Sequence, residues 1–255
     1  MQERVNLLKH ALAEGRPAIG LWCSLASALT TEIIAGSGVD WLLIDGEHSP
    51  NDLRCTVAQL QAAAAFPCEA AVRLPSDDPN LIKQFMDGGA RSLMVPNVRG
   101  ADQARAIVAA MTYAPGGIRG FSVGHRANAF GRIKGYHANA RAQQLLAVQI
   151  ECENGVANAA EIAAVPGVDV LFVGPGDLST NMGAMGNPGA PHVQAAIASV
   201  LRAAQDAGKA AGILAPQQAD AERYIAAGFT MVAVGSDLGL LARGSDDLVA
   251  RFRQR

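Results

Sequence analysis

Short apolar runs recur along the chain and alternate with longer stretches of helical periodicity. Eight runs of this kind predict strands at 18–24, 41–45, 69–74, 92–98, 145–151, 168–174, 210–214 and 231–235. Several are apolar almost throughout, as is typical of strands buried on both faces of a parallel sheet. Eight such strands with helices between them over 255 residues predict a single (β/α)8 TIM barrel domain, 1–255. An open doubly wound sheet is the alternative, but the first run lacks a Gly-rich dinucleotide loop.

Turn residues indicate where several helices begin and end. Ser49 followed by Pro50 predicts an N-cap and first helical residue, and Asp78 followed by Pro79 repeats the pattern. Glycines are expected to end helices at 87–90, 206–209 and 226–229. The segment 114–144 interrupts the alternation of strands and helices because it is long and rich in glycine. We predict that it is an active-site loop.

Polar residues follow four of the predicted strands at their carboxyl ends. They are Asp45, Glu47, His48, Arg73, Gln149, Glu151 and Asp177. In a (β/α)8 barrel these strand ends meet at one mouth, where the chemistry takes place. The sequence therefore predicts a cluster of ionisable groups there.

Glu151 and Asp177 lie at neighbouring strand ends. Two carboxylates, completed by water and substrate oxygens, suit a hard divalent ion such as Mg²⁺ or Mn²⁺. Each could instead be a solvated loop charge or a helix cap. No histidine or cysteine cluster has zinc spacing, and the four scattered cysteines indicate reduced thiols.

His48 and Arg73 are candidates for acid–base chemistry and charge stabilisation. A helix starting after His48 would disfavour a protonated imidazole and leave it able to accept a proton, although a capping or packing role is the alternative. Arg73 ends an apolar strand, so a buried guanidinium needs an anionic partner there. That partner could be Asp45 or Glu47, or the oxyanion of a substrate.

Composition narrows the function further. A net charge of −2 offers no basic footprint for nucleic acid and no polybasic membrane patch. The amino-terminal segment lacks the apolar core of a signal peptide, and no apolar run is long enough to span a membrane, so we predict a cytoplasmic protein. Only four lysines occur and none ends a predicted strand, which disfavours a Schiff-base mechanism.

These residues lie in stretches that together resemble a known family. The stretches are WLLIDGEHSPND, AVRLPSDDPNLIKQFMDGGA, YAPGGIRGFSVGHRANAFGR, VQIE, FVGPGDLS and GILAPQQADAERYIAAGFTMVAVGSDLG. From about residue 16 onward the chain resembles the HpcH/HpaI aldolases, metal-dependent class II pyruvate aldolases on a (β/α)8 barrel. GFSVGHRANAFG and the stretch from Gly212 most resemble the 2-dehydro-3-deoxyglucarate aldolase branch. The 4-hydroxy-2-oxoheptanedioate aldolases are similar around the metal.

The resemblance implies roles for the ligand-binding residues. Glu151 and Asp177 match metal ligands, of Mg²⁺ or else of Mn²⁺ or Co²⁺. Gln149, the position of Gly176, and Asp177 match substrate-binding contacts. The family usually has Ala or Ser where this chain has Gly176, a change that would preserve a backbone N–H contact but remove a hydroxyl contact.

The resemblance also implies catalytic roles. His48 matches the base and Arg73 the stabiliser of the transition state, while Asp87 matches a carboxylate that supports the histidine. Asp87 ends a predicted helix at the opposite face of the barrel, so it could reach a site only through a neighbouring subunit or an unexpected bend. Asp45, which could hold a metal-bound water, is the simpler alternative.

The resulting expectation is a lyase with a small hydroxy-oxo-acid substrate and no nucleic acid or membrane partner. It would cleave 2-dehydro-3-deoxyglucarate or 5-dehydro-4-deoxyglucarate to pyruvate and tartronate semialdehyde. The first alternative is 4-hydroxy-2-oxoheptanedioate, which would give succinate semialdehyde. A barrel enzyme that handles a different enolate through Mg²⁺, or a non-catalytic barrel that binds a small acid, would also be compatible with these residues. The resemblance further implies a homo-oligomer, a hexamer.

Overall fold

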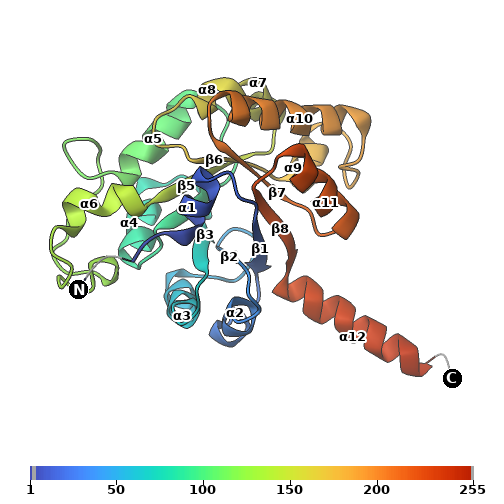
Figure 1. The fold of residues 1–255 in the computed structure, drawn as a ribbon, viewed down its shortest axis with the longest axis horizontal. Coiled ribbons are helices and arrows are strands. Elements are labelled where there is room, and N and C mark those ends of the chain that lie inside the picture. Colours follow the sequence, from blue (N-terminus) through green and yellow to red (C-terminus); the bar gives the residue numbers. More distant parts are fainter. Residues whose placement is uncertain (2–3, 254–255) are drawn as a thin grey trace.

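Eight parallel strands close into a barrel in the computed structural model, which describes Met1 and residues 4–253 (Figure 1). The strands are β1 (Ala18–Cys23), β2 (Trp41–Asp45), β3 (Glu69–Arg73), β4 (Ser92–Val95), β5 (Leu145–Ile150), β6 (Val170–Val173), β7 (Ala210–Leu214) and β8 (Met231–Ser236). Each pairs in parallel with the next, and β8 pairs with β1. The predicted (β/α)8 barrel is confirmed, and all eight predicted runs contain a strand.

Helices surround this barrel. They are α1 (Leu7–Ala13), α2 (Ala28–Ala35), α3 (Leu53–Ala63), α4 (Pro79–Asp87), α5 (Ala101–Met111), the 3₁₀ helix η1 (Arg126–Asn128), α6 (Tyr136–Gln143), α7 (Glu153–Ala157), α8 (Ala159–Ala163), α9 (Pro175–Asn181), α10 (Pro191–Asp206), α11 (Gln218–Ala227) and α12 (Asp237–Arg253). Among the described residues, none of these helices combines the length and apolar character needed to cross a membrane.

Aromatic rings fill the barrel interior. Trp22 lies 5.7 Å from Phe172 between ring centroids, and Trp41 lies 6.4 Å from Phe172. Gly20 leaves the space for this packing, because an added Cβ there would collide with the Trp41 ring. The interior is therefore a packed core, and any chemistry is confined to the ends of the barrel.

The predicted helix boundaries are confirmed at α4 but not at α3. Asp78 caps α4, since its carboxylate accepts hydrogen bonds from the N–H groups of the first turn. The predicted start at Ser49 and Pro50 is wrong. Asp52 is the N-cap of α3 and accepts from Cys55 N at 2.7 Å, while the Ser49 hydroxyl donates to the carbonyl of Asp45. Because the Ser49 hydroxyl is bonded to the end of β2, Ser49 does not cap the helix. The helix begins at Leu53, several residues after His48.

Two segments depart from the regular arrangement of helices around the barrel. The segment 114–144 follows α5 and precedes β5, which places it at the amino-terminal end of the barrel. Helix α12 is anchored where Asp237 accepts from the backbone of Ser24 and Leu25, and then projects from the barrel (Figure 1).

Candidate active site

Arg73 lies at the centre of the polar cluster, at the carboxyl end of β3. Its side chain is 7% exposed. Asp45 is its neighbour in register on β2, and the two side chains pair in a fork: Nε donates to Oδ1 at 2.9 Å and Nη2 donates to Oδ2 at 2.7 Å. This bidentate geometry fixes the plane of the guanidinium. The predicted partnership of Arg73 with a nearby carboxylate is confirmed.

Trp22 lies on the interior side of Arg73 and packs against its guanidinium. The guanidinium carbon of Arg73 lies 5.6 Å from the centroid of the Trp22 ring, a cation–π arrangement. Trp22 is also part of the aromatic barrel core. The arginine is thus held from the side by Asp45 and from below by the interior packing.

Glu47 links Arg73 to His48. Its Oε2 lies 2.9 Å from Arg73 Nη1 and 3.9 Å from His48 Nε2. The His48 side chain is 63% exposed at the rim. Burial raises the pKa of Glu47, and the positive charge of Arg73 only partly offsets that rise. The arrangement places an accessible imidazole and a fixed guanidinium on either side of one carboxylate.

Asp45 organises the turn that carries these groups. The backbone N–H groups of Glu47 and His48 donate to its Oδ1 at 3.0 and 3.3 Å, in addition to the two bonds from Arg73. Burial alone would raise the pKa of Asp45, but hydrogen bonds and charge from Arg73 outweigh it, so the pKa lies below its ordinary value. Asp45 is therefore a structural anion that positions both candidate catalytic side chains.

Glu151 follows β5 and is 5% exposed. Its Oε1 accepts from the backbone N–H of Asn97 at 2.7 Å, and its Oε2 accepts from Gln149 Nε2 at 3.1 Å. Burial raises the pKa of Glu151 to about 7, opposed by the Asn97 bond and reinforced by the charges of Asp177 and Glu47. Gly174 leaves the space beside this carboxylate, since an added Cβ would lie 2.5 Å from Oε2.

Asp177 lies in the first turn of α9 and is exposed. Its charge raises the pKa of both Glu151 and Glu47, which shows that the carboxylates share one electrostatic environment. Gly176 precedes it, and a Cβ added there would meet nothing within 4 Å. The space that an Ala or Ser would fill is therefore open in this chain.

These side chains converge at one mouth, as the strand-end pattern predicts. Comparisons with known proteins show which family the chain belongs to. The family model described as HpcH/HpaI aldolase/citrate lyase matches residues 18–244. The chain belongs to this family. It is 49% identical to the 4-hydroxy-2-oxovalerate aldolase of Rhodococcus jostii, over 100% of this chain and 98% of that protein. It is 48% identical to the 4-hydroxy-2-oxo-heptane-1,7-dioate aldolase of Salmonella dublin, over 97% of this chain and 94% of that protein.

A solved structure of a family member from Burkholderia cenocepacia superimposes with a TM-score of 0.95 at 41% identity, covering 98% of this chain and 100% of that one. The enzyme is thus a carbon–carbon lyase of the pyruvate aldolase type. Class II pyruvate aldolases of this family generally depend on a divalent metal ion.

The donor set of the enzyme suits such an ion with few protein ligands. Among the described residues, no three His, Cys, Asp or Glu side chains group together as a complete cage. Glu151 and Asp177 repel each other, and Gln149 Oε1 is buried with no hydrogen-bond partner among residues 4–253. A hard cation with its water ligands would relieve both the repulsion and the unpaired oxygen.

Asp87 does not join this cluster within one chain. It ends α4, and its Oδ1 accepts from Arg119 Nη2 at 2.6 Å, with His125 Nε2 at 3.9 Å. Both partners belong to the segment 114–144 at the amino-terminal end of the barrel. A role for Asp87 or for this segment at the mouth of an active site stays a prediction that requires a neighbouring subunit.

Two contributors to the site are absent from the sequence-based prediction. Asn97 holds Glu151 through its backbone N–H, with a left-handed φ of 53°. Asn97 lies just past β4, but its contact is made by the backbone, so the type of its side chain gives no signal for it. Trp22 gave no such signal, because a tryptophan within an apolar strand is typical of a core position.

Proposed function

We propose that the enzyme cleaves a 4-hydroxy-2-oxo acid to pyruvate and an aldehyde by a retro-aldol reaction. One observation carries the proposal: the buried Arg73 guanidinium is fixed by Asp45 at the mouth that also contains Glu151. A preorganised donor in a partly desolvated site stabilises a developing oxyanion without reorganising during the reaction. The enolate of pyruvate is such an oxyanion.

Glu151 and Asp177 would hold a divalent ion, Mg²⁺, Mn²⁺ or Co²⁺. When bound, that ion would supply Lewis-acid polarisation of the 2-oxo and carboxylate oxygens of the substrate. Gln149 keeps a second N–H on Nε2, beyond the bond to Glu151, for a substrate oxygen. The backbone N–H of Gly176 is the second proposed contact to pyruvate.

His48 and Arg73 would carry the proton and charge movements. His48, directly or through a water molecule, takes the proton from the 4-hydroxyl group. The C3–C4 bond breaks, C4 becomes the aldehyde carbonyl, and the bonding electrons form the pyruvate enolate. Arg73 donates to the enolate oxygen, and protonation at C3 completes pyruvate. A positioned base contributes about 10²–10⁴-fold to such a rate, and an oxyanion donor about 10²–10³-fold.

Within this substrate class, 4-hydroxy-2-oxoheptanedioate fits better than the glucarate-derived acids that the sequence stretches favoured. Relatives near 49% identity over almost the whole chain are described as aldolases of 4-hydroxy-2-oxovalerate and 4-hydroxy-2-oxo-heptane-1,7-dioate. We therefore propose pyruvate and succinate semialdehyde as the products to test first, with tartronate semialdehyde as the alternative aldehyde.

A retro-aldol screen coupled to pyruvate detection tests the proposal. The heptanedioate, the valerate and the deoxyglucarate acid would be assayed with Mg²⁺, Mn²⁺ and Co²⁺ in turn. We expect metal-dependent pyruvate release that stops after EDTA treatment and returns on adding metal. Full activity after EDTA would contradict the metal proposal, and pyruvate release from none of the acids would favour a barrel that only binds a small acid or acts on another enolate.

We also propose that the enzyme works as a homo-oligomer, for which the family resemblance implies a hexamer. Leu238, Leu241 and Leu248 on α12 are more than half exposed and spaced to form one stripe. On α2, Leu29 and Ile33 are 68% and 65% exposed one turn apart. Exposed apolar faces of this kind mark protein interfaces. The four cysteines are free thiols, which supports the proposed cytoplasmic location.

A further inference from the structure

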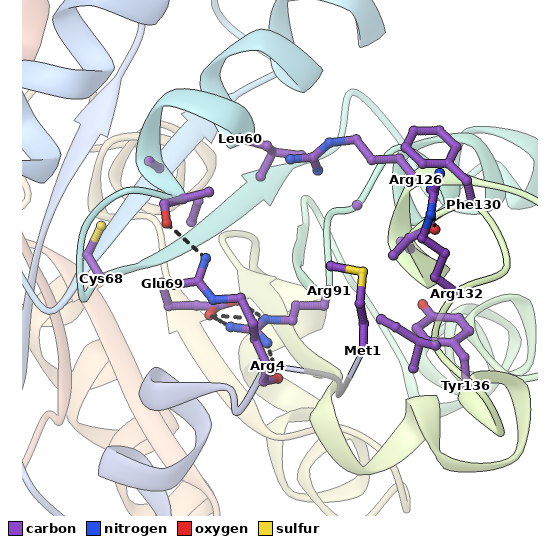
Figure 2. A pocket seen from close by; sticks show the side chains of 17 residues that line it. Met1, Arg4, Leu60, Cys68, Glu69, Arg91, Arg126, Phe130, Arg132 and Tyr136 are labelled. Carbon is purple, nitrogen blue, oxygen red and sulfur yellow. Dashed lines mark hydrogen bonds and ion pairs between the residues drawn. The ribbon is translucent and has the colours of Figure 1, made fainter.

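A pocket of about 580 Å³ lies at the amino-terminal end of the barrel, opposite the proposed active site. Its walls come from the end of α3, the start of β3, the turn after α4, and the segment from η1 to α6. Figure 2 shows side chains from these separate segments facing a common space, with Leu60 and Arg126 on one side and Arg91 and Arg4 on another. No residue that we assign to the active site at the mouth of the same barrel lines it.

The charges on the pocket wall are unbalanced. Four arginines line it: Arg4, Arg91, Arg126 and Arg132. The only acidic side chain among the described lining residues is Glu69. Glu69 is already committed, since it accepts from Arg91 at 2.6 and 3.0 Å and from the Ser92 hydroxyl at 2.8 Å. The remaining cationic groups therefore have no carboxylate within the described wall.

Arg126 is the clearest case of a cation without a counterion. It is half-buried, and burial lowers the pKa of its guanidinium. Its hydrogen bond is to the carbonyl of Gly88, with Nη1 at 3.0 Å, and no described carboxylate forms an ion pair with it. Gly89, at a φ of +108°, accommodates it, because an added Cβ would collide with the guanidinium. The turn at Gly89 thus makes room for the guanidinium of Arg126. No group on the described wall offsets the cost of burying that charge.

Arg132 is a second arginine on the wall of this pocket. Its Nη1 donates to the carbonyl of Ala129 at 3.0 Å, and its guanidinium lies 5.9 Å from the Phe130 ring centroid. Neither contact neutralises its charge. Guanidinium groups bind carboxylate and phosphate oxygens in pairs of parallel hydrogen bonds, so two of them at one pocket indicate an oxyanion.

The rest of the wall is apolar. Leu60, Phe130 and Ile133 line it together with several alanines. We propose that this pocket binds a small organic anion, a phosphate monoester or carboxylate with an apolar body, whose charged end contacts Arg126 and Arg132. Within one chain none of these residues belongs to the mouth at the other end of the barrel, so the proposal rests on other observations than the aldolase reaction does.

Calorimetric titration with phenyl phosphate and with inorganic phosphate, on the intact protein in EDTA, tests this. We expect phenyl phosphate to bind more tightly than inorganic phosphate, since only it can contact the apolar wall. The variants Arg126→Gln and Arg132→Gln should each weaken binding about tenfold or more. Arg105→Gln is the matched control, because Arg105 is an exposed arginine on α5 that pairs with Asp102 and does not line the pocket. The titration of this variant should match that of the unchanged protein.

Arg73 could also bind phosphate. The measured quantity is therefore the difference in phosphate affinity between the unchanged protein and Arg126→Gln. The variant Ile133→Glu keeps every arginine and supplies a carboxylate to the wall, so it should also weaken binding at least tenfold. This covers the case in which an arginine variant fails to fold. Equal binding by Arg126→Gln or Ile133→Glu would overturn the proposal, as would no detectable binding of either probe to the unchanged protein at about 10 mM, well above a millimolar dissociation constant.

Discussion

Replacing Arg73 by lysine isolates the geometry of the guanidinium from its charge. Lysine keeps the positive charge near Asp45 but cannot reproduce two parallel bonds to Oδ1 and Oδ2 together with the 2.9 Å contact to Glu47. If Arg73 stabilises the enolate, the loss of a preorganised donor should lower kcat by about 10²–10³-fold, or about 2.7–4 kcal/mol. KM should change much less, because the interaction is made chiefly in the transition state.

The same change also has a structural effect that must be measured separately. Asp45 is 2% exposed, and losing one of its charge-assisted bonds should cost about 1.5–3 kcal/mol of folding stability. For a domain of this size that corresponds to a fall in Tm of about 3–12 °C. Steady-state pyruvate release, assayed well below the new Tm, therefore reports on catalysis, while a thermal melt reports on folding.

Arg223→Lys is the matched control. Arg223 also pairs with a carboxylate, Asp220 at 2.8 Å, and lies 4.2 Å from the Tyr224 ring, but on α11 outside the barrel. Its kcat should be unchanged. If Arg73→Lys kept kcat within about threefold of the unchanged enzyme while its Tm fell, Arg73 would be reduced to a structural partner of Asp45, and the oxyanion role would be refuted.

Three further predictions test the neighbouring residues and the assembly. His48→Ala should lower kcat by about 10²–10⁴-fold with little change in Tm, because the side chain is 63% exposed. His10→Ala, an exposed change on α1, should leave both kcat and Tm unchanged. Near-normal turnover by His48→Ala would rule out His48 as the base. Asp45→Asn should cost about 3–5 kcal/mol at neutral pH. Since Asp45 has a lowered pKa when folded, its contribution is present above the ordinary carboxyl pKa of about 4 and is lost as pH falls through the folded value. Urea unfolding should show the difference in unfolding free energy between the unchanged protein and Asp45→Asn becoming smaller in acid. A difference that is independent of pH would contradict this. Leu241→Asp should dissociate the oligomer in light scattering, while Ala250→Asp, an exposed change on the opposite face of the same helix, should not. An unchanged mass for both variants would exclude α12 from the interface.

The barrel and the location of the mouth could be predicted because each depends on a strong physical constraint. A strand buried on both faces must be apolar along its length, so all eight strands are visible as apolar runs. A polar group directly after such a run has only the strand-end mouth to occupy, and Asp45, Arg73, Gln149 and Glu151 are found there. The pairing of Arg73 with both nearby carboxylates follows from the need to neutralise a buried guanidinium.

The local chemistry of the turns was harder to predict because several residues compete for the same bonds. Ser49 and Asp52 both carry acceptors suited to a helix cap, and the sequence does not show that the Ser49 hydroxyl is taken by the carbonyl of Asp45. With the helix beginning at Leu53, His48 owes its position to Asp45 and Glu47 and not to a helix terminus. The contact from Asn97 to Glu151 is made by the backbone, which any residue could supply.

The aldehyde half of the substrate could not be predicted for a related reason. The glucarate branch was favoured by stretches that include GFSVGHRANAFG, yet in one chain residues 120–131 lie at the amino-terminal end of the barrel, near Asp87 and away from Glu151. Such residues can influence the substrate only if a second subunit brings them to the mouth of the first. Subunit arrangement leaves no periodic pattern in a sequence, whereas the residues proposed to hold the metal and pyruvate all lie in one chain. We therefore expect a single chain to specify pyruvate as the common product, and the assembly to specify the aldehyde.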